Sequence, residues 1–513
     1  MRQCGILMPI SSLPGPGGIG CFGKEAYAFV DFLAQAGQQI WQILPLSPTG
    51  FGDSPYQSCS AFAGNPYFID LQTLLREGLL HYADLLELDW GDDPETVDYG
   101  AVYNNRFPLL RKAYSAFNMQ CCGVHGFSHY PPDDYYAFTL KNEAWLDDYA
   151  LYMALKTAHN MQGWQQWPEP LKNRDPEALA AFRAENEYEI DFWKFLQYEF
   201  DCQWRALHDY AAEKGVKILG DMPIYAAPDS ADAWAGGPLF ERTADGRFAR
   251  VAGCPPDYFS ADGQLWGNPL YDWEYHKRTG YAWWVQRMRR MLELYDIVRI
   301  DHFRGFDTYW AIPADSETAR TGKWEQGPGI GLFQALEAAL GGKLPIVAED
   351  LGELFPSVRQ LLEATGFPGM KVLQFAFSGG EEYLPYSYPK NCVVYPGTHD
   401  NTTAEDWWQN VASRKEKAFA ARYLRVAPGQ SGREAMLAAV LGSVADTAII
   451  PMSDWLGMGA EGRLNTPGVL GGNWTWRAAR GFDRPELADR IREECVTYGR
   501  TSPREKKAPA AAK

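Results

Sequence analysis

The sequence predicts an α/β protein whose core is a (β/α)8 TIM barrel, with a helical insertion after the second strand and a loop-rich insertion after the third. Three observations lead to this fold class. The chain has 513 residues, enough for one large barrel with insertions. Eight short apolar, β-branched runs end in proline, glycine or an acidic residue, and several segments between them have helical period or composition. Short buried strands that alternate with helices are typical of parallel β/α units.

The elements follow in chain order from these two patterns. We expect strands at residues 5–10, 39–44, 216–220, 296–300, 345–348, 371–376, 392–395 and 447–451. We expect helices between them at 24–37, 281–295, 332–340, 354–365 and 404–424.

Two gaps between strands are too long for simple connections and set the domain organisation. The barrel is assigned to residues 1–65 and 190–505, with a mostly helical insertion at 66–189. Residues 222–273 are rich in glycine, proline and aromatic residues without a clear period, so we expect a loop-rich insertion over the barrel mouth. The tail, residues 506–513, is expected to be disordered.

Composition narrows the class of protein further. With 46% hydrophobic and 22% charged residues, the chain can bury a sizeable core. Its net charge of −17 repels phosphate backbones and anionic membrane surfaces, so nucleic acid and membranes are not expected partners. The apolar run near the N-terminus is too short for a signal peptide or a membrane span, which predicts cytoplasmic localisation.

Nine cysteines without regular spacing indicate reduced thiols rather than a disulfide framework. Cys121, Cys122, His125 and His129 form the one Cys/His cluster. Neighbouring cysteines seldom both reach one tetrahedral zinc ion, so a surface loop is favoured over a metal site.

A glycine-rich segment follows the first predicted strand. Gly15, Gly17 and Gly20 match the spacing G-x-G-x-x-G of dinucleotide-binding loops. Four residues separate the segment from the strand, two prolines stiffen it, and no acidic residue ends the second strand to hold a ribose. We therefore interpret it as a turn-forming loop at the barrel rim and expect no cofactor.

Acidic residues stand at the ends of four predicted strands. Asp221, Asp301, Glu349 and Asp400 would meet at the mouth of a barrel, because the carboxyl ends of its strands share one face. The alternative is that each acid caps the helix that follows. Arg299 lies two residues before Asp301, on the same strand face, and should favour its ionised form.

Two carboxyl groups in different electrostatic settings are what retaining glycoside chemistry requires. One attacks the anomeric carbon, and the other protonates the leaving oxygen and then deprotonates the incoming hydroxyl. A third acid can hold the sugar 2- and 3-hydroxyls. Asp301, Glu349 and Asp400 would fill these roles in that order.

Several sequence blocks resemble those of a known family. SSLPGPGGIG, GDSPYQ, GDMPIY, AGCPPDYFSADGQLWGNPLYDW, VRIDHFRG, IVAEDLG and GTHDNTT are similar to the blocks of 4-α-glucanotransferases (amylomaltase, disproportionating enzyme), glycoside hydrolase family 77. The similarity extends from about residue 5 to Asn473 and Trp474, and the chain is similar to the short members, without extra N-terminal domains.

The resemblance implies an enzyme that transfers α-1,4-glucan segments to the 4-hydroxyl of another glucan or glucose through a covalent glycosyl-aspartate. Its partners would be α-1,4-glucans and maltooligosaccharides, without metal or cofactor. The implied nucleophile, acid/base and transition-state stabiliser are Asp301, Glu349 and Asp400. The implied sugar-binding and positioning residues are Tyr56, Asp221, Arg299 and His399.

The aromatic segment 253–273 is a candidate acceptor-binding loop. Tyr258 and Trp266 offer flat faces for pyranose rings, and Gly263 and Gly267 let the segment bend. The alternative is an aromatic mini-core beneath a long loop.

Two other functions are compatible with the same acids. They are an α-amylase-like retaining hydrolase and a catalytically silent glucan-binding barrel.

Overall fold

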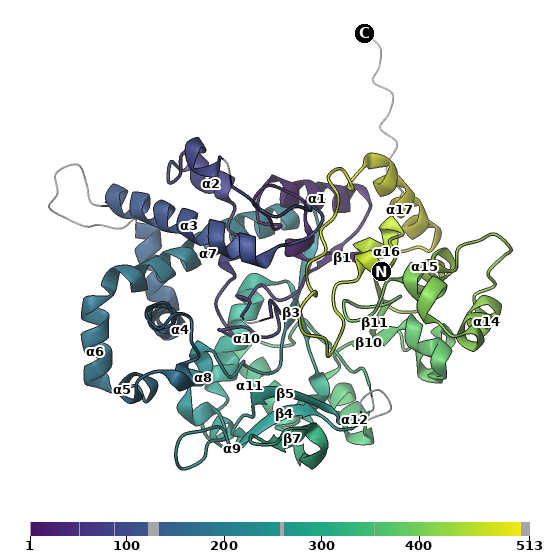
Figure 1. Ribbon diagram of the computed structural model, residues 1–513. Helices are drawn as coiled ribbons and strands as arrows, with labels where there is room; N and C mark the ends of the chain where they lie inside the picture. The colour runs from purple at the N-terminus through teal and green to yellow at the C-terminus, as the bar shows by residue number, and fades with distance from the viewer. Residues whose placement is uncertain are drawn as a thin grey trace, which may run out of the picture.

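The computed structural model describes residues 2–50, 52–86, 88–121, 133–256, 261–352 and 354–503. Its centre is a sheet of eight parallel strands in the order β10-β11-β12-β1-β2-β3-β6-β9 (Figure 1). The strands are β1 (Gln3–Leu7), β2 (Ile40–Gln42), β3 (Lys217–Met222), β6 (Ile297–Ile300), β9 (Ile346–Ala348), β10 (Gly369–Val372), β11 (Cys392–Tyr395) and β12 (Thr447–Pro451).

The two ends of this sheet meet. The Ala348 amide in β9 donates a hydrogen bond to the Pro368 carbonyl, just before β10, at 2.9 Å. The strands are buried almost throughout, as their valine- and isoleucine-rich sequences require in a sheet covered on both faces. The predicted (β/α)8 barrel is confirmed.

Two predicted strands are too long. Ile10–Ser12 and Leu373–Ser378 are turns of 3-10 helix rather than strand. The apolar run continues past the hydrogen-bonded strand in both places, because most of these residues are still buried. Periodicity alone does not separate a buried strand from a buried turn.

Helices cover the barrel on its outside. They are α1 (Lys24–Gln35), α7 (Glu187–Glu213), α9 (Trp273–Arg278), α10 (Ala282–Leu294), α11 (Ile330–Leu340), α12 (Pro356–Thr365), α13 (Ala404–Asp406), α14 (Arg414–Tyr423), α15 (Gly432–Gly442), α16 (Met452–Leu456) and α17 (Pro485–Thr497). The single helix predicted at 404–424 is wrong. It is divided into α13, a π-helical turn at Trp407–Val411 and α14, because Ser413 and Glu416 form a capping box that starts a new helix.

The segment after β2 contains α2 (Leu71–Arg76), α3 (Tyr99–Cys121), α4 (Asp133–Ala158), α5 (Glu169–Lys172) and α6 (Pro176–Glu185). Figure 1 shows α3 to α6 grouped to one side of the barrel. Helix α7 packs against α4 of this group and against α1 of the barrel, so it belongs to both parts. The division at residues 66–189 remains a proposal.

The segment after β3 is less irregular than predicted. It contains α8 (Ala231–Ala235), β4 (Arg250–Cys254) and β5 (Gln264–Pro269). These strands join β7 (Thr308–Pro313) and β8 (Lys323–Gln326) in a four-stranded antiparallel sheet, β5-β4-β7-β8, below the barrel in Figure 1. The segment 222–273 thus contains two strands besides its loops, and the boundaries given to it remain a proposal. Gly253 and Gly267 hide the strand pattern, and half of the sheet comes from a later part of the chain.

Several sequence predictions fall outside the described residues. These are Cys122, His125 and His129 of the Cys/His cluster, Tyr258, and the tail at 506–513. Within the described ranges, no helix has both the length and the apolar character needed to span a bilayer.

Candidate active site

The predicted acids come together at the carboxyl end of the barrel. Asp221 is in β3, Asp301 follows β6, Glu349 follows β9 and Asp400 lies in the loop after β11. Because neighbouring parallel strands end at the same face, these four elements deliver their acids to one mouth. Hydrogen bonds and ion pairs between the elements then set each orientation.

Arg299 lies between two of the carboxylates. Its Nη1 donates to both carboxyl oxygens of Asp221, at 2.8 and 2.7 Å, and lies 3.0 Å from Asp301 Oδ1. The Arg299 and Asp221 side chains are 3% and 0% exposed, whereas Asp301 is 29% exposed. The buried pair therefore holds the guanidinium in place, and Asp301 is the carboxylate that opens to a ligand.

The pKa of Asp301 depends on burial as well as on Arg299. Burial raises the pKa of Asp301 to about 6, although the Arg299 guanidinium lowers it. Asp221 and Asp400 raise it further. Arg299 stabilises the carboxylate, as predicted from the two-residue spacing, but desolvation outweighs this effect.

Glu349 is held by two backbone amides. His302 N–H donates to Oε2 and Leu351 N–H donates to Oε1, each at 2.8 Å. Burial raises the pKa of Glu349 to about 7, opposed by Arg299 and reinforced by Asp301. Near neutral pH this carboxyl group can therefore hold a proton that it later releases.

The side chain of Asp350, the neighbour of Glu349, points away from the site toward β10. It is buried and accepts the N–H of Met370, in β10, at 2.6 Å. The acid that faces the site is thus Glu349 and not Asp350.

His302 contributes through its backbone and was missed by the sequence reasoning. Its φ of 52° is left-handed, a conformation that is uncommon for residues other than glycine. This conformation accompanies the donation of its N–H to Glu349. Burial lowers the pKa of the imidazole to about 3, so the ring is neutral. No sequence pattern predicts a positive φ at a histidine.

Asp400 has a side-chain partner that was also missed. Asn465 Nδ2 donates to Asp400 Oδ1 at 2.6 Å, and His399 Nε2 lies 3.4 Å from Oδ2. The carboxylate is nevertheless 44% exposed. Asn465 fixes the orientation of Asp400 and leaves it accessible from the mouth.

Tyr56 and His399 connect the acids through an aromatic cluster. The Tyr56 hydroxyl donates to Asp221 Oδ2 at 2.9 Å and lies 2.9 Å from His399 Nε2. Their rings stack at 5.3 Å between centroids, and the Trp474 ring lies 5.7 and 6.0 Å from them. The predicted positioning residues Tyr56, Asp221, Arg299 and His399 therefore form one connected group.

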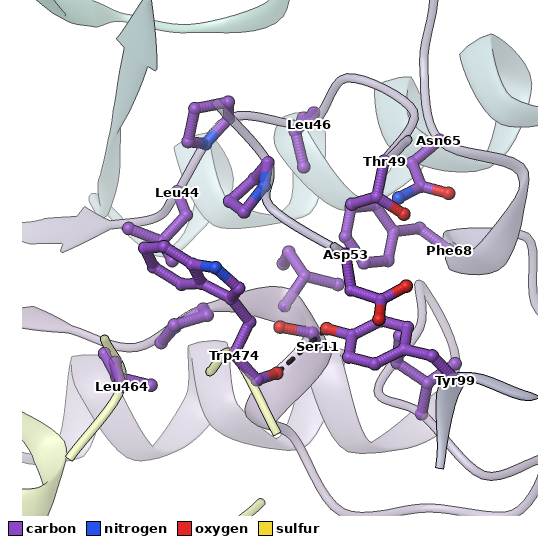
Figure 2. A pocket seen from close by; sticks show the side chains of 15 residues that line it. Ser11, Leu44, Leu46, Thr49, Asp53, Asn65, Phe68, Tyr99, Leu464 and Trp474 are labelled. Atoms are coloured by element: carbon purple, nitrogen blue, oxygen red, sulfur yellow. Dashed lines mark hydrogen bonds between the residues drawn. The ribbon is translucent and has the colours of Figure 1, made fainter. Parts of the chain in front are cut away.

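Trp474 also lines a narrow pocket beside this group. Figure 2 shows the pocket between Trp474, Tyr99 and Asp53, and the Tyr99 hydroxyl donates to the Trp474 carbonyl at 2.8 Å. Its volume is about 20 Å³, too small for a sugar ring. The described residues that line this pocket include none of the four acids at the mouth.

The sequence predicted Trp266 in a loop. In the structure Trp266 lies on strand β5. Its ring is half-buried and meets the His302 ring edge-on, 4.9 Å between centroids. The contact brings an aromatic face next to the residue that holds Glu349. Tyr258, its predicted partner in sugar stacking, lies outside the described residues.

Comparisons with known proteins relate the whole chain to one family. The family model described as 4-alpha-glucanotransferase, glycoside hydrolase family 77, matches residues 8–482. A 4-alpha-glucanotransferase of Clostridium butyricum is 46% identical over 499 residues, covering 96% of this chain and 100% of the relative. One of Thermus thermophilus is 45% identical over 501 residues, covering 96% of this chain and 97% of the relative. The solved structure of Streptococcus agalactiae amylomaltase in complex with acarbose has a TM-score of 0.93 at 40% identity, covering 98% of this chain and 100% of that chain.

Proposed function

Because the chain belongs to the 4-alpha-glucanotransferases of glycoside hydrolase family 77, it transfers α-1,4-glucan segments, and we propose that it does so by retaining double displacement at the mouth of its barrel. Asp301 is the nucleophile, Glu349 the acid/base and Asp400 the stabiliser of the transition state. The observation that carries this assignment is that the two carboxyl groups have different partners. Asp301 forms an ion pair with the Arg299 guanidinium, whereas Glu349 accepts hydrogen bonds from two backbone amides.

In the first half-reaction, an Asp301 carboxylate oxygen attacks C1 of the donor sugar and forms an ester bond to it. The bond between C1 and the O4 atom of the next glucose breaks, and O4 takes the proton of Glu349. The shortened glucan leaves with a free 4-hydroxyl. Glu349 becomes ionised, and the glycosyl-aspartate retains the transferred segment.

In the second half-reaction, the 4-hydroxyl oxygen of an acceptor attacks C1 on the face that the leaving group has vacated. Glu349 takes the hydroxyl proton, the ester bond breaks, and Asp301 becomes a carboxylate again. Two inversions at C1 restore the α-linkage. This route predicts a separation of roughly 5–5.5 Å between the two carboxyl groups.

The remaining polar groups are assigned to the sugar. Asp400, exposed and oriented by Asn465, is proposed to accept hydrogen bonds from the sugar 2- and 3-hydroxyls. Tyr56 and His399 line the same side of the mouth. The acarbose bound in the Streptococcus agalactiae amylomaltase supports α-glucans and maltooligosaccharides as ligands of this site. Cytoplasmic localisation stays a prediction.

Incubation with maltotriose tests the reaction directly. We expect glucose together with a ladder of longer maltooligosaccharides, because each turnover moves a glucan unit to another sugar. The products are separated by chromatography, and the total number of reducing ends should stay constant. Glucose and maltose without longer products would show that water is the acceptor and that the chain is a hydrolase.

The pH dependence of kcat/KM should follow the two carboxyl groups. Activity needs Asp301 ionised and Glu349 protonated, and their pKa values are raised to about 6 and about 7. The rate is therefore expected to rise as pH increases through 6 and to fall as pH increases through 7, with both limbs belonging to the coupled pair. A profile measured from pH 4 to 9 that stays flat above pH 7 contradicts the role of Glu349.

Trp266→Ala tests the acceptor side of the site. The loss of one stacked ring should weaken acceptor binding by about 1 kcal/mol, or about fivefold, and let water compete for the glycosyl-enzyme. The measurement is the number of reducing ends released per transfer event. Trp266→Phe is the matched control, since it keeps an aromatic face next to His302. An unchanged ratio in the alanine variant would assign Trp266 to packing only. The same shift is predicted for Tyr258→Ala.

A further inference from the structure

The two ring nitrogens of His399 have different surroundings. Nε2 lies 2.9 Å from the Tyr56 hydroxyl and 3.4 Å from Asp400 Oδ2. The Tyr56 hydroxyl has one proton and donates it to Asp221 Oδ2, since a carboxylate paired with Arg299 has no proton to give. Burial raises the pKa of Tyr56 well above its usual value, so the hydroxyl keeps this proton. The proton between His399 and Tyr56 therefore belongs to His399 Nε2.

In an imidazole whose one proton is on Nε2, Nδ1 is a hydrogen-bond acceptor. His399 is 3% exposed, and Nδ1 has no hydrogen-bond partner within the part of the chain that the structure describes. A buried polar nitrogen without a partner is costly, so something else is expected to donate to it.

A second buried polar atom, Asp454 Oδ2, also lacks a hydrogen-bond partner among the described residues. Asp454 lies at the start of α16 and is 1% exposed. Its other oxygen, Oδ1, accepts the N–H of Ala404 at 2.7 Å, which anchors the carboxyl group. Arg433 donates to the Asp454 main-chain carbonyl at 2.8 Å and leaves Oδ2 unpaired.

His399 and Asp454 line the same small cavity. Thr398, Thr402 and Ser453 are also part of its wall, and all five residues are buried. The cavity has a volume of about 10 Å³. This is close to the space that one water molecule needs, and the wall is polar enough to hold it.

We propose that one buried water molecule bridges His399 Nδ1 and Asp454 Oδ2, and that Asp454 is thereby a positioning residue that keeps the His399 proton on Nε2. The water has two protons, one for each acceptor. Burial raises the pKa of Asp454 to about 7. Both protonation states serve, because a protonated Oδ2 donates to the water and the water still donates to Nδ1.

The consequence for the site is a fixed arrangement of the residues beside Asp400. With its proton on Nε2, His399 donates to the Tyr56 hydroxyl, which in turn donates to Asp221, so the group beside Asp400 keeps one set of hydrogen bonds. This consequence rests on the role proposed above for His399, whereas the tautomer is a property of the protein without substrate.

The tautomer is measured on the full-length protein labelled with 15N-histidine. The His399 signals are identified by their absence in His399→Gln. At neutral pH we expect a protonated Nε2 and an unprotonated, hydrogen-bonded Nδ1. A proton on Nδ1 would overturn the inference. The predicted tautomer in a protein without glucan transfer would overturn the proposed function and leave this inference standing.

Two substitutions at Ser453 separate the water from the surrounding packing. Ser453→Val fills the cavity and displaces the water, whereas Ser453→Ala leaves space for it, and both keep the bond from Ala404 to Asp454. The valine variant should lose the hydrogen-bonded Nδ1 signal and about tenfold in kcat, with KM changed less than about twofold. The alanine variant should keep both. An unchanged Nδ1 signal in Ser453→Val contradicts the proposal.

A crystal structure of the unsubstituted protein provides a test that does not depend on the folding of any variant. Electron density for a water molecule within hydrogen-bond distance of both His399 Nδ1 and Asp454 Oδ2 is the expected result. An empty cavity, or a water that reaches only one of the two atoms, refutes the bridge.

Discussion

Asp301→Asn is expected to lower the rate of glucan transfer from maltotriose by about 10⁴-fold or more, because the amide cannot form the ester bond to C1. This loss is larger than the one expected when a general acid is removed. The barrier rises by more than about 5 kcal/mol for a loss of this size. Packing should change little, since asparagine has the shape of aspartate and Arg299 keeps both of its bonds to Asp221. The measurement is the initial rate of glucose release.

The matched control for this variant is Asp245→Asn. Asp245 is 57% exposed, lies on the small loop before β4 and is paired with Arg247. It carries the same chemical change without any contact to the mouth, and its rate should equal that of the unsubstituted protein. If a glycosyl adduct still formed on the Asp301→Asn protein, another residue would have to be the nucleophile.

Glu349→Gln is expected to lower transfer from maltotriose by about 10²- to 10⁴-fold, since O4 then leaves without a proton. A maltosyl fluoride donor separates the two half-reactions. Fluoride needs no proton to leave, so the glycosyl-enzyme should still form, and it should accumulate because no base activates the acceptor. The intact-protein mass should increase by one maltosyl group.

The double variant Asp301→Asn with Glu349→Gln is the control for the adduct, and its mass should not change. Asp350→Asn tests the neighbouring acid. Asp350 binds the Met370 amide and faces away from the site, so that variant should retain the acid/base step. If Glu349→Gln kept nearly normal activity on maltotriose, the assignment of the proton donor would be wrong.

Much of the barrel was predictable because its strands are short, apolar and buried. Residues 392–395 and 447–451 were predicted as strands, and β11 and β12 have the same bounds. The small antiparallel sheet was not predicted, since β4 pairs with β7, more than fifty residues later in the chain. A pairing between distant segments leaves no local period in the sequence.

The candidate site divides in the same way. Asp301, Glu349 and Asp400 were found because each follows a predicted strand, where a polar residue would not belong in the core. Asn465 and Trp474 were not found, because their partners lie in other parts of the chain: Asn465 binds Asp400, and Trp474 packs on Tyr56. His302 acts through its backbone angle, and Asp454 acts through the cavity that it lines. Neither feature can be predicted from the type of residue.

The sequence alone predicted the class of fold, the family and three candidate catalytic acids, because residue types at strand ends and ordered motifs are local properties of the chain. Tertiary structure decided how those acids behave. Only the folded barrel brings Tyr56 to 2.9 Å from His399, 343 residues later in the chain, and places Arg299 between two carboxylates. The charge states of Asp301 and Glu349 depend on burial and on neighbours from other strands, so these states exist only after the strands have closed around them.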